Sequence, residues 1–315
     1  MEYRSLGEDM PAPARIVLGT MIFGLDRADE WFRLLDEYRA IGGNCLDTGR
    51  IYWGGESERV IGEWLKRRGI RDEFLIITKG AHPKPDGIPR VTPSAIEDDL
   101  AKSLDALGVD SIDLYLLHRD DPDVPVGEIV DCLDEKLRSG QIKRYGGSNW
   151  TAGRIEEANA YAKKHGKSGF TLSSPNLSLA VPNEPRWRGC VSLSTDDLPW
   201  YERTQMPVFS WSSQAGGFFT GAFHPEKRDD ADMVRVYYSD ENWARLERAR
   251  ALAKEKGVEA THIALAYVLS QGFPTFALIG PKSIEELKVS TEQAELRLTP
   301  EEVRWLDGRV TSRSA

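Results

Sequence analysis

The chain has 315 residues, which is long enough for one large domain of the α/β-barrel type. Its formal net charge of −9 disfavours a nucleic-acid surface, which is normally a basic stripe. No run of about 18 apolar residues is present, and the N-terminus lacks a signal-peptide core. We therefore expect a cytoplasmic protein with a small-molecule partner and no nucleic acid or membrane; the oligomeric state stays open.

Eight short apolar segments follow one another along the chain, and we interpret them as strands. They span residues 16–20, 44–48, 74–79, 113–118, 142–149, 170–174, 207–211 and 275–280. Between them, apolar residues recur with a period near 3.6, which predicts helices at 27–42, 56–68, 93–107, 126–138 and 151–164. A further segment, 241–270, also separates two strands.

This alternation of strands and helices predicts a parallel sheet covered by helices. Eight repeats predict closure into a (β/α)8 TIM barrel, with a short N-terminal capping segment and a C-terminal helix. No linker divides the sequence, so we treat 1–315 as a single domain. The long, poorly periodic stretch 175–206 follows strand six, at the face where such barrels build their active sites.

Four polar residues lie at the ends of consecutive predicted strands. Asp47, Lys79 and His118 end strands two, three and four, and Tyr52 follows in the loop after strand two. A tyrosine with a pKa of about 10 is a poor acid at neutral pH unless a neighbouring ammonium stabilises its phenolate. Lys79 can do so, Asp47 can hold Lys79 in place, and His118 can direct a carbonyl oxygen. Each residue alone has a structural explanation, but the set favours one catalytic site.

Seven motifs in a fixed order carry a resemblance to a known family. They are LGTMIFG (18–24), LDTGRIYWGGESE (46–58), ITKG (77–80), GVDSIDLYLLHR (108–119), GGSNW (146–150), FSWSSQAGGFFTG (209–221) and IGPKSIEEL (279–287). With them the sequence resembles the aldo-keto reductases. The resemblance implies a nicotinamide cofactor bound without a Rossmann domain and reversible reduction of an aldehyde, ketone or sugar carbonyl by hydride transfer. Tyr52 would be the general acid.

The resemblance also implies contacts to the cofactor. Ser148 and Asn149 match the pair that hydrogen-bonds the nicotinamide carboxamide, and Trp211 matches the aromatic residue that stacks on the ring. Lys282 and Ser283 could contact a ribose 2′-phosphate, which favours NADP(H). The remaining matched contacts are Gly19, Thr20, Met21, Ser212, Gln214 and Gly280.

Three positions depart from the family pattern. Ser174 stands where glutamine is common, Glu286 where arginine or glutamine is common, and Ser290 where asparagine is frequent. We still expect all three to contact the cofactor. A carboxylate at Glu286 would repel a 2′-phosphate but could accept from a ribose hydroxyl, so NAD(H) remains possible.

Four aromatic residues fall on successive loops at the mouth of the predicted barrel, the end at which its strands finish. They are expected to form the walls of the substrate pocket. They are Phe23, Trp53, Trp150 and Trp187. Such walls admit aryl aldehydes or sugars, because sugar faces also stack on indole rings. The alternative for these residues, and for Trp211, is a role in the core.

Three other functions were weighed. One is an NAD-dependent sugar or alcohol dehydrogenase, and another is a redox-sensing regulatory subunit with little turnover, resembling potassium-channel β subunits of this superfamily. A metal hydrolase is disfavoured, because no histidine or carboxylate cluster has metal-ligand spacing. His82, His165, His224 and His262 form no His-x-His pair. Cys45, Cys132 and Cys190 form neither a disulfide framework nor a zinc pattern.

Overall fold

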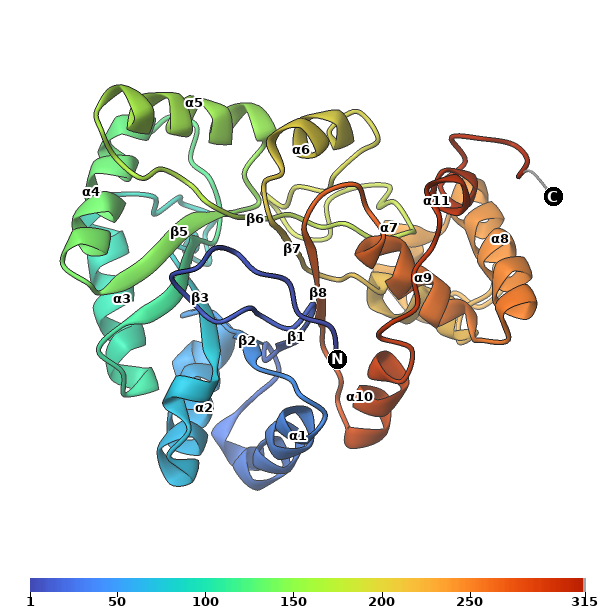
Figure 1. Ribbon diagram of the computed structural model, residues 1–315, viewed down its shortest axis with the longest axis horizontal. Coiled ribbons are helices and arrows are strands. Elements are labelled where there is room, and N and C mark those ends of the chain that lie inside the picture. The colour runs from blue at the N-terminus through green and yellow to red at the C-terminus, as the bar shows by residue number, and fades with distance from the viewer. Residues whose placement is uncertain (314–315) are drawn as a thin grey trace.

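A computed structural model describes residues 1–313 of the chain (Figure 1). The apolar segments form eight parallel strands. Each strand pairs with the next one, and β8 pairs with β1. The strands are β1 Ile16–Gly19, β2 Cys45–Asp47, β3 Leu75–Gly80, β4 Ile112–Leu117, β5 Ile142–Ser148, β6 Ser173–Ser174, β7 Val208–Ser210 and β8 Thr275–Ile279. The expectation of a closed (β/α)8 TIM barrel is confirmed.

Helices surround the barrel in Figure 1. They are α1 Ala28–Ala40, α2 Glu56–Arg68, α3 Pro93–Leu107, α4 Val126–Arg138, α5 Ala152–Lys164, α6 Leu198–Thr204, α7 Ala231–Tyr237, α8 Asp240–Lys256, α9 Ala260–Leu269, α10 Ile284–Thr291 and α11 Pro300–Leu306. The five helices predicted from periodicity are all present. The segment 241–270 forms two helices, because Gly257 adopts a left-handed φ of 68° that ends α8.

The predicted strand 170–174 is wrong in its first three residues. Only Ser173 and Ser174 pair with the neighbouring strands. Phe170 and Leu172 are buried, so the segment is as apolar as a strand without being one. Apolar periodicity reports burial, and it does not distinguish a paired strand from a buried loop.

Two layers of apolar side chains fill the fold. Alternate strand residues such as Val17, Ile77 and Leu116 form the barrel interior, while their neighbours pack outward against the helices. Met10, from the segment before β1, packs against the interior cluster. The same segment pairs through a bridge between Tyr3 and Ala14, so the expected N-terminal cap is confirmed.

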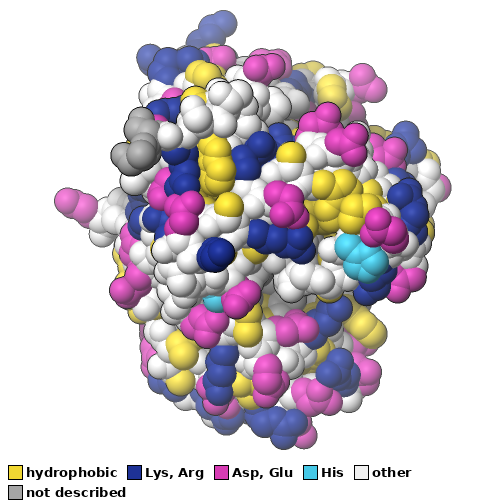
Figure 2. Space-filling model, turned by 90° about the vertical axis from the view of Figure 1, so that its right-hand side faces the viewer, with side chains coloured by type: hydrophobic (Ala, Val, Ile, Leu, Met, Phe, Trp, Pro, Cys, Tyr) yellow, Lys and Arg dark blue, Asp and Glu magenta, His cyan; other side chains and the backbone are white. Residues whose placement is uncertain are grey.

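The last helix closes one side of the molecule. On α8, Arg248 donates through Nε to the carbonyl of Leu306 at the end of α11, so the expected C-terminal helix packs back onto the barrel domain. The face seen in Figure 2 carries interspersed positive and negative side chains. None of the helices within residues 1–313 has the length and apolar character needed to cross a membrane.

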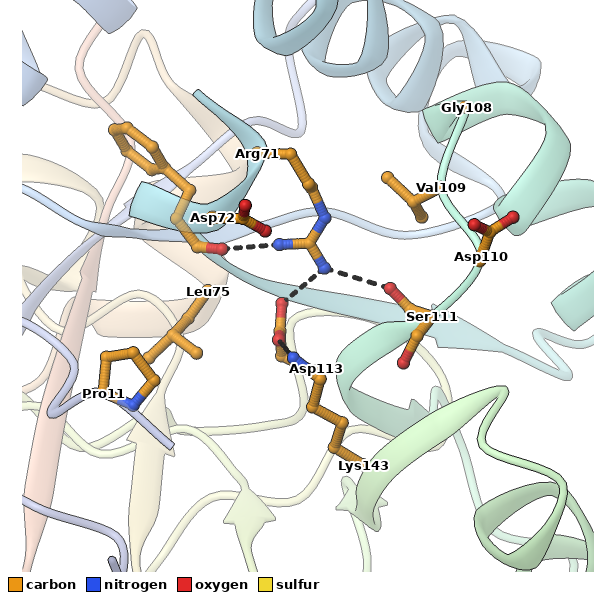
Figure 3. A pocket seen from close by; sticks show the side chains of 11 residues that line it. Pro11, Arg71, Asp72, Leu75, Gly108, Val109, Asp110, Ser111, Asp113 and Lys143 are labelled. Carbon is orange, nitrogen blue, oxygen red and sulfur yellow. Dashed lines mark hydrogen bonds and ion pairs between the residues drawn. The ribbon is translucent and has the colours of Figure 1, made fainter. Parts of the chain in front are cut away.

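A pocket of about 320 Å³ lies at the N-terminal ends of β3, β4 and β5 (Figure 3). Its centre is the buried Asp113, whose carboxylate lies 2.8 Å from Nη2 of Arg71 and 2.7 Å from Nζ of Lys143. Asp113 also accepts from the backbone N–H of Ile76 at 2.9 Å. The pocket therefore holds a structural ion-pair network, at the opposite end of the strands from the candidate catalytic residues.

Gly62 on α2 provides a test of the packing between α2 and α3. A Cβ there would lie 2.6 Å from the carbonyl oxygen of Leu107 and 2.7 Å from that of Ala106. Alanine usually stabilises a helix interior, but here the clash involves backbone. We predict that Gly62→Ala lowers the free energy of unfolding by about 1–3 kcal/mol, measured by chemical denaturation.

The matched control is Gly153→Ala on α5, where a Cβ would meet no atom within 4 Å. This variant should be as stable as the unsubstituted protein, or more stable by up to about 1 kcal/mol. Equal stability of the two variants would contradict the close approach of α2 and α3.

Candidate active site

The parallel register brings the four candidate catalytic residues to one end of the barrel. Asp47 is the last residue of β2, Lys79 lies one residue before the end of β3, and His118 directly follows β4. The Nζ atom of Lys79 lies 2.7 Å from Oδ1 of Asp47 and 3.4 Å from the hydroxyl of Tyr52. The ring of His118 lies 5.5 Å from that of Tyr52, so these side chains converge on one mouth, as the sequence predicts.

Lys79 and Asp47 form a buried ion pair. Lys79 also donates to the carbonyl oxygen of Thr48 at 2.7 Å. Burial alone would lower the pKa of Lys79, but Asp47 and Tyr52 raise it above its ordinary value. Burial raises the pKa of Asp47, and Lys79 opposes that effect. The ammonium is thus held charged beneath the Tyr52 hydroxyl.

The loop that carries Tyr52 has an unusual backbone. Tyr52 begins a short 3-10 helix, Tyr52–Gly55, in which Trp53, Gly54 and Gly55 have φ of 49°, 62° and 98°. A Cβ at Gly55 would lie 1.9 Å from the guanidinium of Arg50. The left-handed φ of Gly55 and this close approach both favour glycine there, and α2 begins at the next residue.

A buried ion pair holds this loop against α2. Arg50 lies 2.7 Å from Oε2 of Glu58 and donates to the carbonyl of Gly54 at 3.0 Å. The fully buried Glu58 also accepts from the Thr78 hydroxyl at 2.7 Å, one residue before Lys79. The loop after β2 and the end of β3 are thus tied to the same carboxylate.

Tyr52 is more weakly acidic than the sequence suggested. Burial raises its pKa above the ordinary value, and the opposing effect of Lys79 is smaller. We expected Lys79 to lower the pKa of Tyr52. Its contribution does lower the pKa, but the net change is a rise, so the expected direction was wrong. Because the ring is partly exposed at the mouth, water screens part of the effect. Tyr52 is protonated at neutral pH and can donate a proton.

His118 is neutral and has a second imidazole beside it. Burial, reinforced by Lys79 and Arg119, holds the pKa of His118 well below its ordinary value. Its ring lies 5.5 Å from that of Tyr52 and 4.8 Å from that of His82, both edge to face. Sequence reasoning missed His82, although its position two residues after β3 could have placed it at the mouth.

The residues expected to hold the nicotinamide form one hydrogen-bonded group. Ser148 donates to the carbonyl of Ser174 at 2.9 Å, and Asn149 donates to the carbonyl of His118 at 3.1 Å. The indole N–H of Trp211 donates to Oδ1 of Asn149 at 3.1 Å. The buried hydroxyl of Ser174 has no partner among the described residues. That orphaned hydroxyl fits a carboxamide, whose oxygen and N–H groups would satisfy it.

The expected adenosine end lies at the start of α10. Ser283 caps this helix by accepting from the N–H of Glu286 at 3.2 Å. Glu286 in turn accepts from the backbone N–H of Lys282 at 2.7 Å. Ser290 donates to Gln214 at 3.3 Å, which links α10 to the loop after β7. The described structure shows no partner for the exposed ammonium of Lys282, whereas the Glu286 carboxylate occupies the helix start.

The remaining expected contacts lie around the ends of β1, β7 and β8. Thr20 is buried and donates to the carbonyl of Asp47 at 3.0 Å. Met21 is exposed, and Ser212 has a left-handed φ of 50°. A Cβ at Gly19 would lie 3.1 Å from the carbonyl oxygen of Ile279, whereas one at Gly280 would meet nothing within 4 Å.

Two of the four predicted pocket aromatics are not at the surface. Phe23 is fully buried and stacks on Trp31 at 4.6 Å. Trp150 is also fully buried, packs against Phe170 and donates to the carbonyl of Arg119. The expectation that these two wall the pocket was wrong, because both fill space between the barrel and its helices.

Trp53 and Trp187 are exposed, with exposed fractions of 54% and 44%, so the prediction that they line the pocket stays open. The Trp187 ring lies 5.9 Å from that of Trp211, so the long loop after β6 reaches the mouth. Within residues 1–313, no group of three histidine, cysteine or acidic side chains is arranged to hold a metal ion.

Comparison with known proteins identifies the class. Residues 15–310 match the sequence model of the Aldo/keto reductase family. The chain belongs to this family and is an oxidoreductase. It is 30% identical to the uncharacterized oxidoreductase YrpG of Bacillus subtilis, over 98% of this chain and 95% of the relative.

Two further relatives have more specific names. The chain is 30% identical to the putative aryl-alcohol dehydrogenase AAD14 of Saccharomyces cerevisiae, over 90% of this chain and 77% of the relative. It is 31% identical to norsolorinic acid reductase A of Aspergillus parasiticus, over 93% of this chain and 76% of the relative.

The raised pKa of Tyr52 and the lowered pKa of His118 predict the pH dependence of carbonyl reduction. Tyr52 stays protonated up to and beyond its ordinary pKa of about 10, and His118 stays neutral down to well below about 6.5. We therefore expect kcat/KM for reduction to be level between about pH 6.5 and pH 10. A loss of activity between pH 7 and pH 9, measured in constant-ionic-strength buffers, would contradict this electrostatic picture.

Proposed function

We propose that the protein is an NADP(H)-dependent oxidoreductase that reversibly reduces an aldehyde or ketone to the alcohol, with Tyr52 as general acid. The observation that carries this proposal is the contact of 3.4 Å between the Tyr52 hydroxyl and a lysine ammonium already neutralised by Asp47. Such an arrangement supplies a proton at one fixed point and stabilises the phenolate that remains. Membership of the Aldo/keto reductase family supports the reaction class.

The chain's own residues act on the carbonyl oxygen. His118 is neutral and lies beside Tyr52, so the two can bind the same oxygen and orient the carbonyl. The Tyr52 proton moves to that oxygen as negative charge develops there. The charge left on Tyr52 faces Nζ of Lys79, which Asp47 and the carbonyl of Thr48 hold in place. When bound, the nicotinamide cofactor supplies or accepts the hydride.

The proposed cofactor site runs across the mouth. Ser148, Asn149 and Ser174 would hold the carboxamide, and Trp211 would lie against the ring. The support is the orphaned hydroxyl of Ser174 and the half-buried position of Trp211 beside Asn149. Further contacts would come from Gly19, Thr20, Met21, Ser212, Gln214, Gly280, Lys282, Ser283, Glu286 and Ser290.

Aryl carbonyl compounds are the substrate class that the pocket favours. Trp53 and Trp187 present large exposed rings, and flat aromatic substrates gain from stacking on them. The name aryl-alcohol dehydrogenase, carried by two of the relatives, agrees with this choice. Sugars remain the alternative, because their faces also stack on indole rings.

Tyr52→Phe tests the general acid. Removing the hydroxyl deletes the proton donor but keeps the ring, so we expect kcat to fall by at least about 100-fold with cofactor affinity within a few-fold. The measurements are steady-state cofactor oxidation and fluorescence titration of the cofactor. Tyr161→Phe on α5 is the control, because it removes a hydroxyl that contacts only Asp131, and it should keep full activity.

Three outcomes separate the alternatives. More than about a tenth of the original kcat in Tyr52→Phe would refute the assignment of Tyr52. Cofactor binding with negligible turnover of a broad aldehyde, ketone and sugar panel would favour the redox-sensing subunit. Faster oxidation of alcohols or sugars with NAD than reduction with NADPH would favour the dehydrogenase.

Lys282→Ala tests the cofactor preference. The exposed ammonium of Lys282 is proposed to pair with a 2′-phosphate, so its loss should raise the KM for NADPH about tenfold and leave that for NADH within twofold. Lys288→Ala, on the α10 helix that follows Lys282, is the control and should change neither value. The Glu286 carboxylate opposes this preference, so Glu286→Gln should lower the KM for NADPH. A lower KM for NADH than for NADPH in the unsubstituted enzyme would overturn the choice of NADP(H).

A further inference from the structure

One buried charge among the residues that the structure describes lacks an opposite charge. Within residues 1–313, nine acidic or basic side chains other than histidine are more than nine-tenths buried. Eight of them form ion pairs: Arg15 with Glu2, Asp47 with Lys79, Glu58 with Arg50, Asp99 with Arg90, Asp113 with Arg71 and Lys143, Asp134 with Arg138, and Asp307 with Arg309. The ninth is Arg119, which is only 6% exposed.

Arg119 directly follows His118, at the catalytic end of the barrel. Its Nη1 donates to the carbonyl of His118 at 2.7 Å, and its Nε donates to the carbonyl of Arg188 at 3.3 Å. A Cβ at Gly189 would lie 3.3 Å from its Cδ, so the loop after β6 packs on the side chain. No described residue accepts a hydrogen bond from Nη2. The guanidinium is fixed by two backbone carbonyls and keeps donor capacity unused.

The neighbouring groups do not neutralise this charge. The next residue, Asp120, forms an ion pair with Arg154 instead, whose Nε lies 3.2 Å from the Asp120 carboxylate. Burial lowers the pKa of His118 and His82, and the positive charge of Arg119 adds to that effect, so both rings are uncharged at neutral pH. Lys79 is already compensated by Asp47. Among the buried charges within residues 1–313, Arg119 is therefore left without compensation.

A buried charge without a counter-charge is costly, and a ligand of the opposite sign would offset that cost. We propose that Arg119 is an anion-binding residue of the substrate site, and that the preferred substrates carry a carboxylate in addition to the carbonyl group. This inference rests on the proposed carbonyl reduction. It narrows the aryl class to acids such as formylbenzoates, whose ring can lie against Trp187 while the carboxylate pairs with the guanidinium.

The test compares each formylbenzoate isomer with its methyl ester, which has the same ring and aldehyde without the charge. With NADPH at pH 7, kcat/KM should be at least tenfold higher for one or more of the acids than for the matching ester. Arg119→Met should remove most of that ratio through KM, while the ester value changes by less than threefold. Arg119→Lys should retain part of the ratio, because it retains the charge.

Arg188→Met is the matched control. Arg188 is exposed on the loop that covers Arg119, so its loss removes a nearby solvated charge without touching the buried one. The acid-to-ester ratio of this variant should stay within twofold of the unsubstituted enzyme. Should it fall as far as in Arg119→Met, general surface charge would explain the preference, and the proposal would be refuted.

Other outcomes also test the role of Arg119. An acid-to-ester ratio near one in the unsubstituted enzyme, or an equal loss on acid and ester in Arg119→Met, would show that Arg119 only braces the loop. If circular dichroism shows that Arg119→Met is unfolded, the test rests on Arg119→Lys and on the acid-to-ester ratio of the unsubstituted enzyme. Turnover of the esters tests carbonyl reduction separately. If nothing is turned over, tighter binding of benzoate than of benzamide, measured by tryptophan fluorescence, still supports the anion site, and equal binding refutes it.

Discussion

The ion pair between Lys79 and Asp47 is the interaction on which the mouth of the barrel depends. Two buried charges are costly to keep apart from water, and they are tolerated here because contacts of 2.7–2.8 Å and a third acceptor, the carbonyl of Thr48, satisfy the ammonium. Only the parallel register of β2 and β3 places these residues side by side. The remaining direction open to the ammonium leads to the Tyr52 hydroxyl, so the position of the proton donor follows from the fold.

The loop after β2 shows how such a site is kept rigid. Three successive residues, from Trp53 to Gly55, have left-handed φ values; the two glycines adopt them readily, whereas Trp53 is strained there and needs support. The support is the ion pair of Arg50 with the fully buried Glu58, which also binds the Thr78 hydroxyl. Strain in the loop is thus offset by the packing of α2, and motion of that helix would displace Tyr52.

Sequence reasoning predicted correctly the features that depend on local periodicity. It was wrong about features that depend on which residues and how much water surround a side chain. Strands, helices and the convergence of Asp47, Lys79 and His118 follow from spacing along the chain. The burial of Phe23 and Trp150 does not, since an aromatic residue in a mouth loop can point either way. The raised pKa of Tyr52 depends on how much water reaches the ring, which no motif encodes. The position of His82, two residues after β3, could be inferred from the sequence, whereas the missing counter-charge of Arg119 depends on which side chains lie around it in space.

The electrostatics of the mouth link these observations. Tyr52 is protonated, His118 and His82 are uncharged, and Lys79 is paired, so these groups leave the charge of Arg119 uncompensated. The negative charge that develops during reduction appears on the carbonyl oxygen and on Tyr52, and Nζ of Lys79 already faces that hydroxyl. Arg119 is held by the carbonyls of His118 and Arg188, and its charge is left for a carboxylate carried elsewhere on the substrate. Selectivity for acids and stabilisation of the developing oxyanion therefore draw on different cations, and neutral substrates should lose binding but keep the stabilisation.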